Sequence, residues 1–243
     1  MSDPVFLVAV LPAAGETVLD GPEGRHAATV RRLAVGERLV LTDGAGGMAS
    51  CVVTDVGRDR LALDVGELRH VPRPSPRVTV VQALPKGDRG ELAVEVMTEA
   101  GVDAIVPWQA ARCVTRWRDG RGAKGLSRWR TAAREAAKQS RRVWLPEITE
   151  PATTGAVVSR LTEAAASLVL HQASDRPLAT ARLPANGDIV LVVGPEGGVT
   201  DEEIDAFVAA GATTVRLGDT VLRTSTAGVA ALSAVNALTA RWR

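Results

Sequence analysis

The chain has 243 residues, a length that fits one or two domains and allows a sizeable core without disulfides. Hydrophobic residues make up 46% and charged residues 23%, the mix of an ordinary soluble globular protein. The only two cysteines, Cys51 and Cys113, exclude a disulfide scaffold and a multi-cysteine zinc site. The 3 histidines lie far apart with no ligand spacing, so no metal is predicted. Aromatic residues make up only 3%, which argues against recognition built mainly on stacking.

The formal net charge of +1 hides a segregation of charge along the chain. Residues 1–72 carry a net charge of −3, residues 73–150 carry +6 and residues 151–243 carry −2. The central basic block therefore needs a local explanation. No apolar run approaches the roughly 20 residues of a membrane span. The first residues also lack the basic start of a signal peptide. We therefore expect a cytoplasmic protein without membrane contact.

The clearest break is the proline-rich segment 66–77, GELRHVPRPSPR. Its alternate prolines favour an extended connector, and we place the domain boundary near residue 72. Before this boundary, short strands separated by Gly-rich turns predict a small β-barrel with one helix. The expected strands are Val5–Val10, Glu37–Thr42, Ala49–Thr54 and Arg60–Val65, and the expected helix is Gly24–Leu33.

After the boundary, alternating strand and helix patterns predict an α/β domain with a mostly parallel sheet covered on both faces. The expected strands are Val78–Leu84, Ala104–Pro107, Leu168–His171, Ile189–Val193 and Val215–Leu217. The expected helices are Asp88–Ala100, Ser127–Gln139, Thr200–Ala210 and Ser225–Trp242, with a mobile loop over Arg112–Lys124. Thr200 and Glu203 have the spacing of a capping box. Ligands of such sheets bind at the carboxyl ends of the strands.

A glycine-rich turn, Gly194-Pro195-Glu196-Gly197-Gly198, follows the strongest strand pattern. Glycines let a ligand approach the backbone, whose N–H groups can face polar ligand atoms. The turn lacks the Gly-Lys-Ser/Thr of a phosphate loop and the spacing of a dinucleotide motif. Spacing alone leaves a ligand loop and an ordinary strand-to-helix connection equally open.

A second loop, Val215–Ala227, is rich in hydroxyl side chains that are expected as helix caps. Arg223 lies between an apolar pair and the helix start, where it is either a site residue or a surface ion-pair partner. His171, at the end of a buried strand, is either a ligand contact or a satisfied histidine at the edge of the core. Lys86, at another strand end, faces either a ligand or only solvent.

The basic block contains a segment, residues 112–142, with 11 Lys and Arg against two acids. Arg130, Arg134, Lys138 and Arg141 recur at helical spacing and are expected to share a face. Like charges at this spacing repel, so a polyanion partner is favoured over a plain solvated face. The adjacent pair Arg31-Arg32 is weaker evidence of the same kind.

Together, these segments resemble the RsmE family of 16S rRNA (uracil-N3)-methyltransferases, in the knotted SPOUT superfamily. The resemblance covers nearly the whole chain. It is carried, in chain order, by Arg25-His26, Arg31-Arg32-Leu33, Lys86-Gly87-Asp88, Glu99-Ala100-Gly101-Val102, Ile105-Val106-Pro107 with Arg112, Arg128-Trp129, Glu135-Ala136-Ala137-Lys138-Gln139-Ser140-Arg141-Arg142, Gly194-Pro195-Glu196-Gly197-Gly198 with Glu202-Glu203-Ile204, and Leu217-Gly218 with Val221-Leu222-Arg223-Thr224.

The resemblance implies a PUA-like RNA-binding barrel over residues 1–72 and an S-adenosylmethionine-dependent methyltransferase domain with a deep trefoil knot over residues 73–243. It also implies a homodimer that acts on 16S rRNA or the small ribosomal subunit. The implied cofactor-binding residues are His171, Gly194, Pro195, Glu196, Gly197, Gly198, Leu217, Gly218, Val221, Leu222, Thr224 and Thr226. The RNA-binding candidates are Arg25, His26, Arg31, Arg32, Lys86, Arg112, Arg130, Arg134, Lys138, Arg141 and Arg142.

Two departures from the family pattern bear on the chemistry. Ser225 stands where the family usually has an acid, and Asp219-Thr220 replaces Pro-Arg, so the roles of those side chains do not transfer. Uracil N3 must lose its proton before it attacks a methyl carbon, and Arg223 is our candidate to stabilise the resulting charge on a carbonyl oxygen. Glu196 or water remains as the base. The alternatives are a non-catalytic RNA-binding module and a SPOUT methyltransferase that acts on tRNA or a ribose 2′-hydroxyl.

Overall fold

A computed structural model describes residues 3–117 and 119–242, and the chain divides into two compact units. The N-terminal unit contains the residues up to Arg73 together with Ala137–Leu145. The C-terminal unit contains Pro74–Ala136 and Pro146 onward. Within the described residues, no helix is long and apolar enough to cross a membrane.

The N-terminal unit is built on a five-stranded sheet with the order β1-β3-β4-β5-β2, in which β1 is parallel to β3 and the other pairs are antiparallel. Burial alternates along β4, as expected of a strand with one face on a core. That core includes Phe6, Leu39 and Leu61. The strands are β1 Val5–Leu7, β2 Gly15–Leu19, β3 Arg38–Thr42, β4 Gly47–Val56 and β5 Leu61–His70.

Three details of this unit differ from the expectations. The strand β2 was not predicted, because its five residues begin with glycine and glutamate rather than with a β-branched run. The predicted helix over 24–33 is a short α1, Gly21–Arg25, followed by a π-helical turn, His26–Val30. The strand β5 continues to His70, so the extended connector begins at Val71 rather than Gly66.

A segment distant in sequence, Ala137–Leu145, completes the N-terminal unit. The N–H of Gly46 donates to the carbonyl of Val143 at 2.9 Å, and the N–H of Leu145 donates to the carbonyl of Gly44 at 2.9 Å. These hydrogen bonds to the β3–β4 turn explain why the segment, which begins with the last three residues of α3, groups with this unit rather than with the rest of that helix.

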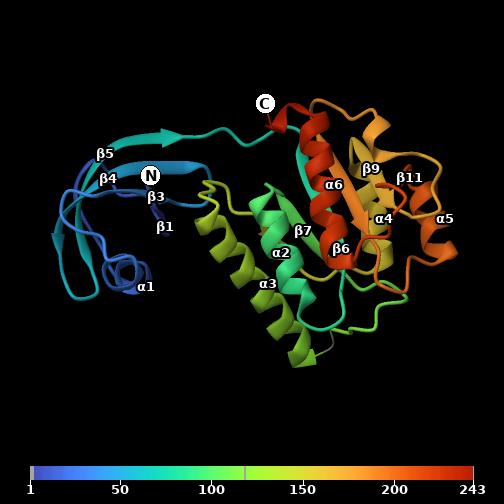
Figure 1. Ribbon diagram of the computed structural model, residues 1–243, viewed down its shortest axis with the longest axis horizontal. Coiled ribbons are helices and arrows are strands. Elements are labelled where there is room, and N and C mark those ends of the chain that lie inside the picture. Colours follow the sequence, from blue (N-terminus) through green and yellow to red (C-terminus); the bar gives the residue numbers. More distant parts are fainter. Residues whose placement is uncertain (1–2, 118, 243) are drawn as a thin grey trace. The chain divides into compact units, whose positions relative to one another are not determined.

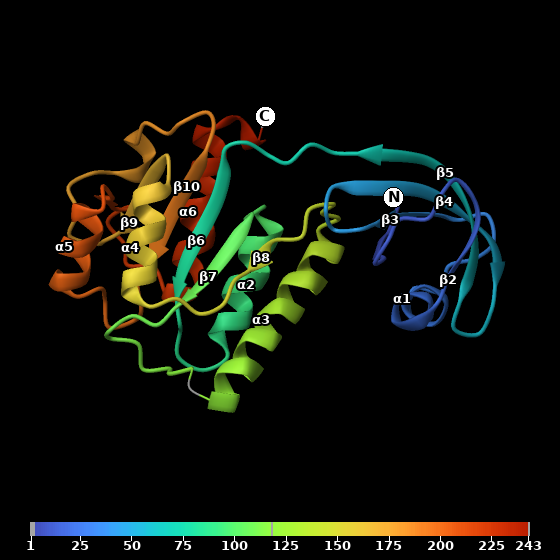
Figure 2. The same ribbon diagram turned by 180° about the vertical axis from the view of Figure 1, so that it is seen from behind.

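The C-terminal unit contains a fully parallel sheet with the order β11-β9-β10-β6-β7-β8. The helices α2 and α6 cover one face, and α4 and α5 cover the other (Figures 1 and 2). The strands are β6 Arg77–Ala83, β7 Ala104–Trp108, β8 Glu147–Ile148, β9 Ala166–Leu170, β10 Asp188–Val193 and β11 Thr213–Val215. The helices are α2 Arg89–Glu99, α3 Asp119–Gln139, α4 Thr154–Glu163, α5 Asp201–Ala209 and α6 Thr224–Leu238.

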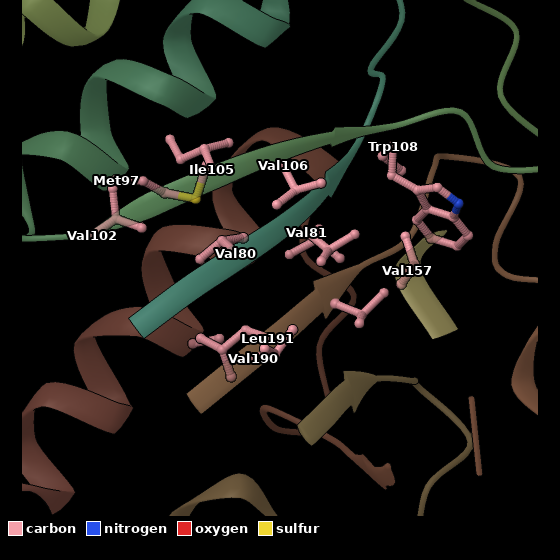
Figure 3. Packing of buried hydrophobic residues seen from close by; sticks show 14 of the residues in the cluster. Val80, Val81, Met97, Val102, Ile105, Val106, Trp108, Val157, Val190 and Leu191 are labelled. Atoms are coloured by element: carbon pink, nitrogen blue, oxygen red, sulfur yellow. The ribbon is translucent and has the colours of Figure 1, made fainter. Parts of the chain in front are cut away.

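The central strands β6 and β10 are buried on both faces, which explains their continuous runs of Val, Ile and Leu. Successive side chains point to opposite faces of the sheet. In Figure 3, Val80 lies on the side of Met97 from α2, whereas Val81 lies on the side of Val157 from α4. Buried side chains therefore pack on both faces of the sheet, against α2 on one face and against α4 on the other.

The prediction of a mobile loop over Arg112–Lys124 is wrong from residue 119 onward, where α3 has already begun. Arg118, inside that range, lies outside the described residues. The ring of Trp117 packs against Trp129 at a centroid distance of 5.1 Å, and a Cβ on Gly125 would lie 2.6 Å from the Trp117 ring. Gly125, within α3, therefore serves close packing against Trp117.

Elsewhere in this unit, element types are confirmed and boundaries move. The helix α4 and the two-residue strand β8 were not predicted. The strand β11 lies two residues before the predicted Val215–Leu217. The helix α6 ends at Leu238, before the predicted end at Trp242. The capping box is confirmed, because the Thr200 hydroxyl accepts from the Glu203 N–H and the Glu203 carboxylate accepts from the Thr200 N–H.

Candidate active site

The C-terminal unit contains a cavity of about 720 Å³ at the carboxyl ends of its strands. This volume lies within the roughly 300–1,000 Å³ of small-molecule sites. The position is the one that a parallel sheet predicts, because the connecting loops gather at that edge. The lining includes Leu170–Gln172 after β9, Val193–Val199 after β10, Val215–Thr224 after β11, and the separate residues Arg89, Arg112, Asp201 and Ala227.

The glycine-rich turn after β10 packs tightly against its neighbours. A Cβ on Gly194 would lie 2.7 Å from Cγ2 of Val199, and a Cβ on Gly197 would lie 3.1 Å from Cβ of Arg112. Gly198 has a φ of +76°, a conformation that favours glycine. The glycines thus bring bare backbone to the wall of the cavity, as the ligand-loop reading of this turn requires.

Glu196 is the acid of this turn, and its side chain is exposed on the cavity wall. Its Oε1 accepts a hydrogen bond from the backbone N–H of Lys86 at 3.1 Å. Within the described residues, its Oε2 has no hydrogen-bond partner. The Lys86 side chain is exposed and does not line the cavity. One carboxylate oxygen is therefore held in place while the other is available to a ligand.

The buried carboxylate of Glu203 connects three segments around the cavity. Its Oε1 accepts from the N–H of Ala111 at 2.9 Å and from the hydroxyl of Thr154 at 3.1 Å, and its Oε2 accepts from the N–H of Thr200 at 3.2 Å. The residue is only 5% exposed. The sequence identified Glu203 as a cap but carried no signal for the other two contacts, because they depend on the fold.

Arg112 follows the segment that Glu203 holds. Its guanidinium donates to the carbonyl of Gly197 at 3.2 Å. The Glu203 carboxylate therefore fixes the backbone next to Arg112, and Arg112 in turn holds the glycine-rich turn. This chain of contacts makes the cavity wall a single connected structure.

The start of α6 forms another side of the cavity. Arg223 is its N-cap residue, and the hydroxyl of Thr226 donates to the Arg223 carbonyl at 3.2 Å. Thr226, predicted as a cofactor contact, does not line the cavity, whereas Thr224 does. Thr224 is 6% exposed, and its hydroxyl has no hydrogen-bond partner among the described residues. The hydroxyl oxygen itself is accessible, so a ligand or water in the cavity can bond to it.

The charged side chains of the cavity are only partly paired. The acids of the lining are Glu196, Asp201 and Asp219, and Asp219 pairs with Arg216 at 2.8 Å. In the part of the chain that the structure describes, the guanidinium groups of Arg89 and Arg223 have neither an ion pair nor a hydrogen bond. Arg89 was missed from the sequence, where it follows Lys86-Gly87-Asp88 without a motif of its own.

The structure corrects the expected common face of the basic helix. Lys138 forms a buried ion pair with Glu23 at 2.9 Å, and its side chain is only 8% exposed. The Lys138 charge therefore stabilises the N-terminal unit instead of facing solvent with its neighbours. Arg130 donates to the carbonyl of Ile148 and to Glu150 at 2.8 Å. Arg134 is exposed and lines a second cavity of about 420 Å³ together with Arg130.

The remaining RNA-binding candidates belong to the N-terminal unit. Arg25, Arg31, Arg32 and Arg141 are exposed, whereas His26 is half-buried with its ring against Phe6. Arg142 is also half-buried. These side chains line neither of the two cavities.

Comparisons with known proteins bear on both units. Residues 72–236 match a family model described as an RNA methyltransferase domain, and residues 19–65 match an RNA methyltransferase PUA domain. The chain is 51% identical to ribosomal RNA small subunit methyltransferase E of Mycobacterium tuberculosis, over 98% of this chain and 93% of the relative. Its identity to the Bacillus subtilis protein of the same name is 31%, over 90% and 88% of the two chains.

A solved structure has a similar fold over almost the whole chain. It is that of a ribosomal RNA small subunit methyltransferase E from Neisseria gonorrhoeae bound to S-adenosyl methionine. The two chains superpose with a TM-score of 0.86 and 29% sequence identity, over 98% of each chain.

Proposed function

This chain belongs to the ribosomal RNA small subunit methyltransferase E family, and we propose that it transfers a methyl group from S-adenosylmethionine to N3 of a uridine in 16S rRNA. The observation that carries this proposal is the cavity at the strand ends, which combines a glycine-rich turn with an unpaired arginine. The substrate named for the relatives is ribosomal RNA of the small subunit, and the related Neisseria structure holds the cofactor.

The residues of the cavity fit this cofactor. The volume of about 720 Å³ leaves room for a nucleoside with an amino-acid side chain and for part of a target nucleotide. The turn Gly194–Gly198 presents backbone groups where side chains would clash. Among the described residues the Thr224 hydroxyl has no partner, and a ligand in the cavity can reach it. We assign the cofactor contacts to these residues and to His171, Leu217, Gly218, Val221 and Leu222, which also line the cavity.

When bound, S-adenosylmethionine supplies a methyl carbon that carries the positive character of its sulfonium. The protein must then make uracil N3 a nucleophile. Once N3 loses its proton, the negative charge of the uracil anion spreads onto O2 and O4. Arg223 lines the cavity and has unused N–H donors, so we assign it to one of these oxygens. A preorganised donor of this kind contributes about 10²–10³-fold to turnover.

The N3 proton needs an acceptor, and Glu196 is the acid best placed for it, either directly or through a water. Its Oε1 is held by the Lys86 N–H, which leaves Oε2 open to the cavity. Asp219 is occupied by Arg216, and Ser225 is buried and does not line the cavity. The positioning of both reactants in one cavity contributes to the rate in addition to this proton transfer.

The N-terminal unit and α3 supply the proposed RNA contacts. We assign residues 1–72 to a PUA-like barrel that holds RNA, and residues 73–243 to the methyltransferase domain. The exposed arginines Arg31, Arg32 and Arg134 support a polyanion partner, since phosphate contacts position RNA without reading its sequence.

We further propose a deep trefoil knot in the methyltransferase domain and a homodimer in the cytoplasm. The order of the sheet supports the knot, because the chain leaves β10 for the edge strand β11 and then returns as α6 against β6 and β10. Exposed apolar side chains support the dimer. They are Val221, 77% exposed and in the cavity lining, and Trp242, 56% exposed after α6.

Methylation of unmodified small ribosomal subunits, followed by mass mapping of the modified nucleoside, tests the proposal. The expected product is 3-methyluridine. A 2′-O-methylated ribose would contradict the assignment to N3, and binding of RNA without any transfer would favour a non-catalytic RNA-binding protein. Isolated 16S rRNA is tested in parallel to identify which form of the substrate the enzyme accepts.

A further inference from the structure

The order of the strands divides the cavity into two parts of different charge. The proposed cofactor contacts follow β9, β10 and β11, which are neighbours at one side of the sheet. The strands β6 and β7 lie on the other side of β10. All three acids of the lining follow β10 or β11, whereas the residues contributed after β6 and β7 are Arg89 and Arg112. The side chains that the segments after β6 and β7 add to the lining are therefore both cationic, and the one acid that reaches the end of β6 is Glu196, through the N–H of Lys86.

Arg89 is the residue in this part of the cavity whose charge no contact within the described protein explains. It is the first residue of α2, its side chain is exposed, and it lines the cavity. A cation at a helix N-terminus is unfavourable, because that end of the helix is itself positive. The acid in the first turn is Glu91, and it pairs with Arg128 at 3.6 Å. Within the described residues, the Arg89 guanidinium has neither an ion pair nor a hydrogen bond.

Arg112 adds a second guanidinium to the same part of the cavity. One of its N–H groups is used on the Gly197 carbonyl, at 3.2 Å. A guanidinium has five N–H donors, so others remain for a ligand. The backbone next to Arg112 is held on both sides, because the N–H of Ala111 donates to the Glu203 carboxylate and the N–H of Cys113 donates to the Ala110 carbonyl at 3.1 Å. The guanidinium therefore projects from a fixed segment of the chain.

We propose that Arg89, together with Arg112, binds a phosphodiester group next to the target nucleotide and so positions the uracil in the cavity. The inference rests on the proposed function. A phosphate suits this site because a planar guanidinium binds two of its oxygens at once. The alternative anion is the carboxylate of the cofactor, since Arg112 also contacts Gly197 of the glycine-rich turn, and the affinity for S-adenosylmethionine distinguishes the two. The unpartnered Thr224 hydroxyl belongs to the side of the proposed cofactor contacts.

The test compares Arg89→Gln, Arg89→Lys and the control Arg160→Gln, which removes the same charge from an exposed position on α4 outside the cavity. Unmodified small ribosomal subunits serve as substrate, and calorimetry measures the affinity for S-adenosylmethionine. We expect Arg89→Gln to raise the KM for small ribosomal subunits about tenfold. The slope of log(kcat/KM) against the logarithm of the salt concentration (the salt slope) should fall in magnitude by about 1. The affinity for S-adenosylmethionine should stay within twofold of the wild type. Arg89→Lys recovers part of the KM, because lysine binds phosphate as a point charge.

Each other outcome overturns the inference in a distinguishable way. If Arg89→Gln weakens cofactor binding as much as it raises the KM, then Arg89 binds the cofactor. If its KM and salt slope equal those of Arg160→Gln, then Arg89 contacts no phosphate, while the methylation by wild type still supports the proposed function. If the wild type itself transfers no methyl group, both the proposed function and this inference fail.

Discussion

The two units of this chain use their loops in different ways. In the C-terminal unit, every strand of the sheet is parallel, so the connections after β9, β10 and β11 gather at one edge and enclose a cavity. In the N-terminal unit, four of the five strands pair antiparallel, and the turns are distributed over both ends of the sheet. Its candidate RNA-binding arginines line neither cavity.

This difference matches a division of labour. A parallel sheet can bring groups from distant parts of the sequence, such as Glu196 and Arg223, to one small volume in which charge can be stabilised. An antiparallel sheet offers a broad surface, which suits phosphate contacts that need no enclosed site. Changes to the groups that act on the uracil in the C-terminal cavity should therefore alter turnover. Changes to phosphate contacts, on the N-terminal surface or at Arg89, should alter affinity for RNA.

The largest expected effect is on the stability of the N-terminal unit. Lys138→Met leaves the Glu23 carboxylate buried without this cation, because both side chains of the pair are nearly buried, at 8% and 11% exposed. Loss of one member of a buried pair costs about 3–5 kcal/mol. We expect hydrogen exchange in β3 to β5 to accelerate accordingly, with a smaller change in β6 and β10. Arg69→Met is the control, since its pair with Glu67 is exposed, and it should leave exchange unchanged. Equal acceleration in both variants would contradict the structural role of Lys138.

A second large effect is expected at Arg223 in the cavity. Arg223→Ala should lower kcat about 10²–10³-fold, because it removes the donor assigned to the uracil oxygen. The affinity for S-adenosylmethionine, measured by calorimetry, should stay nearly unchanged, since this arginine acts on the target base. Parallel losses of kcat and cofactor affinity would assign Arg223 to the cofactor instead. Arg176→Ala, an exposed arginine outside the cavity lining, is the matched control.

The sequence best predicted those structural features that depend on residues close together in the chain. The buried runs of β6 and β10, the capping box at Thr200 and the glycine-rich turn all follow from neighbours within a few residues. The cavity lies at the strand ends as expected, because a parallel sheet gathers its loops there. These features need no knowledge of long-range contacts.

The rest depends on contacts between residues far apart in the chain. Helical spacing predicted that Lys138 shares a face with Arg130 and Arg134, but a helix face does not reveal that Glu23, 115 positions earlier, is buried against it. The same holds for Ala137–Leu145, which joins a unit whose other residues end at Arg73. Arg89 was overlooked because the sequence marked this strand end through Lys86, and no local pattern shows that the first residue of α2 lines the cavity instead.

A smaller effect is expected at Glu203, which tests the connection between the cavity wall and the loop that carries Arg112. Glu203→Gln replaces one carboxylate oxygen by an amide group, so Ala111 N–H, Thr154 and Thr200 cannot all keep their partner. A hydrogen bond to a charged group contributes about 1.5–3 kcal/mol, and we expect a loss of stability in this range together with a roughly tenfold lower kcat/KM. Asp205→Asn removes the same charge from an exposed position of α5 outside the cavity and should change neither quantity. A stability loss with unchanged kcat/KM would restrict Glu203 to a structural role.

The smallest effect is expected for changes on the N-terminal surface. This effect distinguishes affinity for RNA from the rate of methyl transfer. Arg31→Gln with Arg32→Gln removes two exposed charges and should raise the KM for small ribosomal subunits about threefold to tenfold, with an unchanged kcat. The salt slope of kcat/KM should fall by about 1 for each phosphate group that the variant no longer binds. Arg160→Gln with Arg182→Gln removes the same charge from positions of the C-terminal unit outside the cavity and serves as the control. A fall in kcat without a change in salt slope would mean that the N-terminal unit takes part in the chemistry, and the division of labour between the two sheets would have to be abandoned.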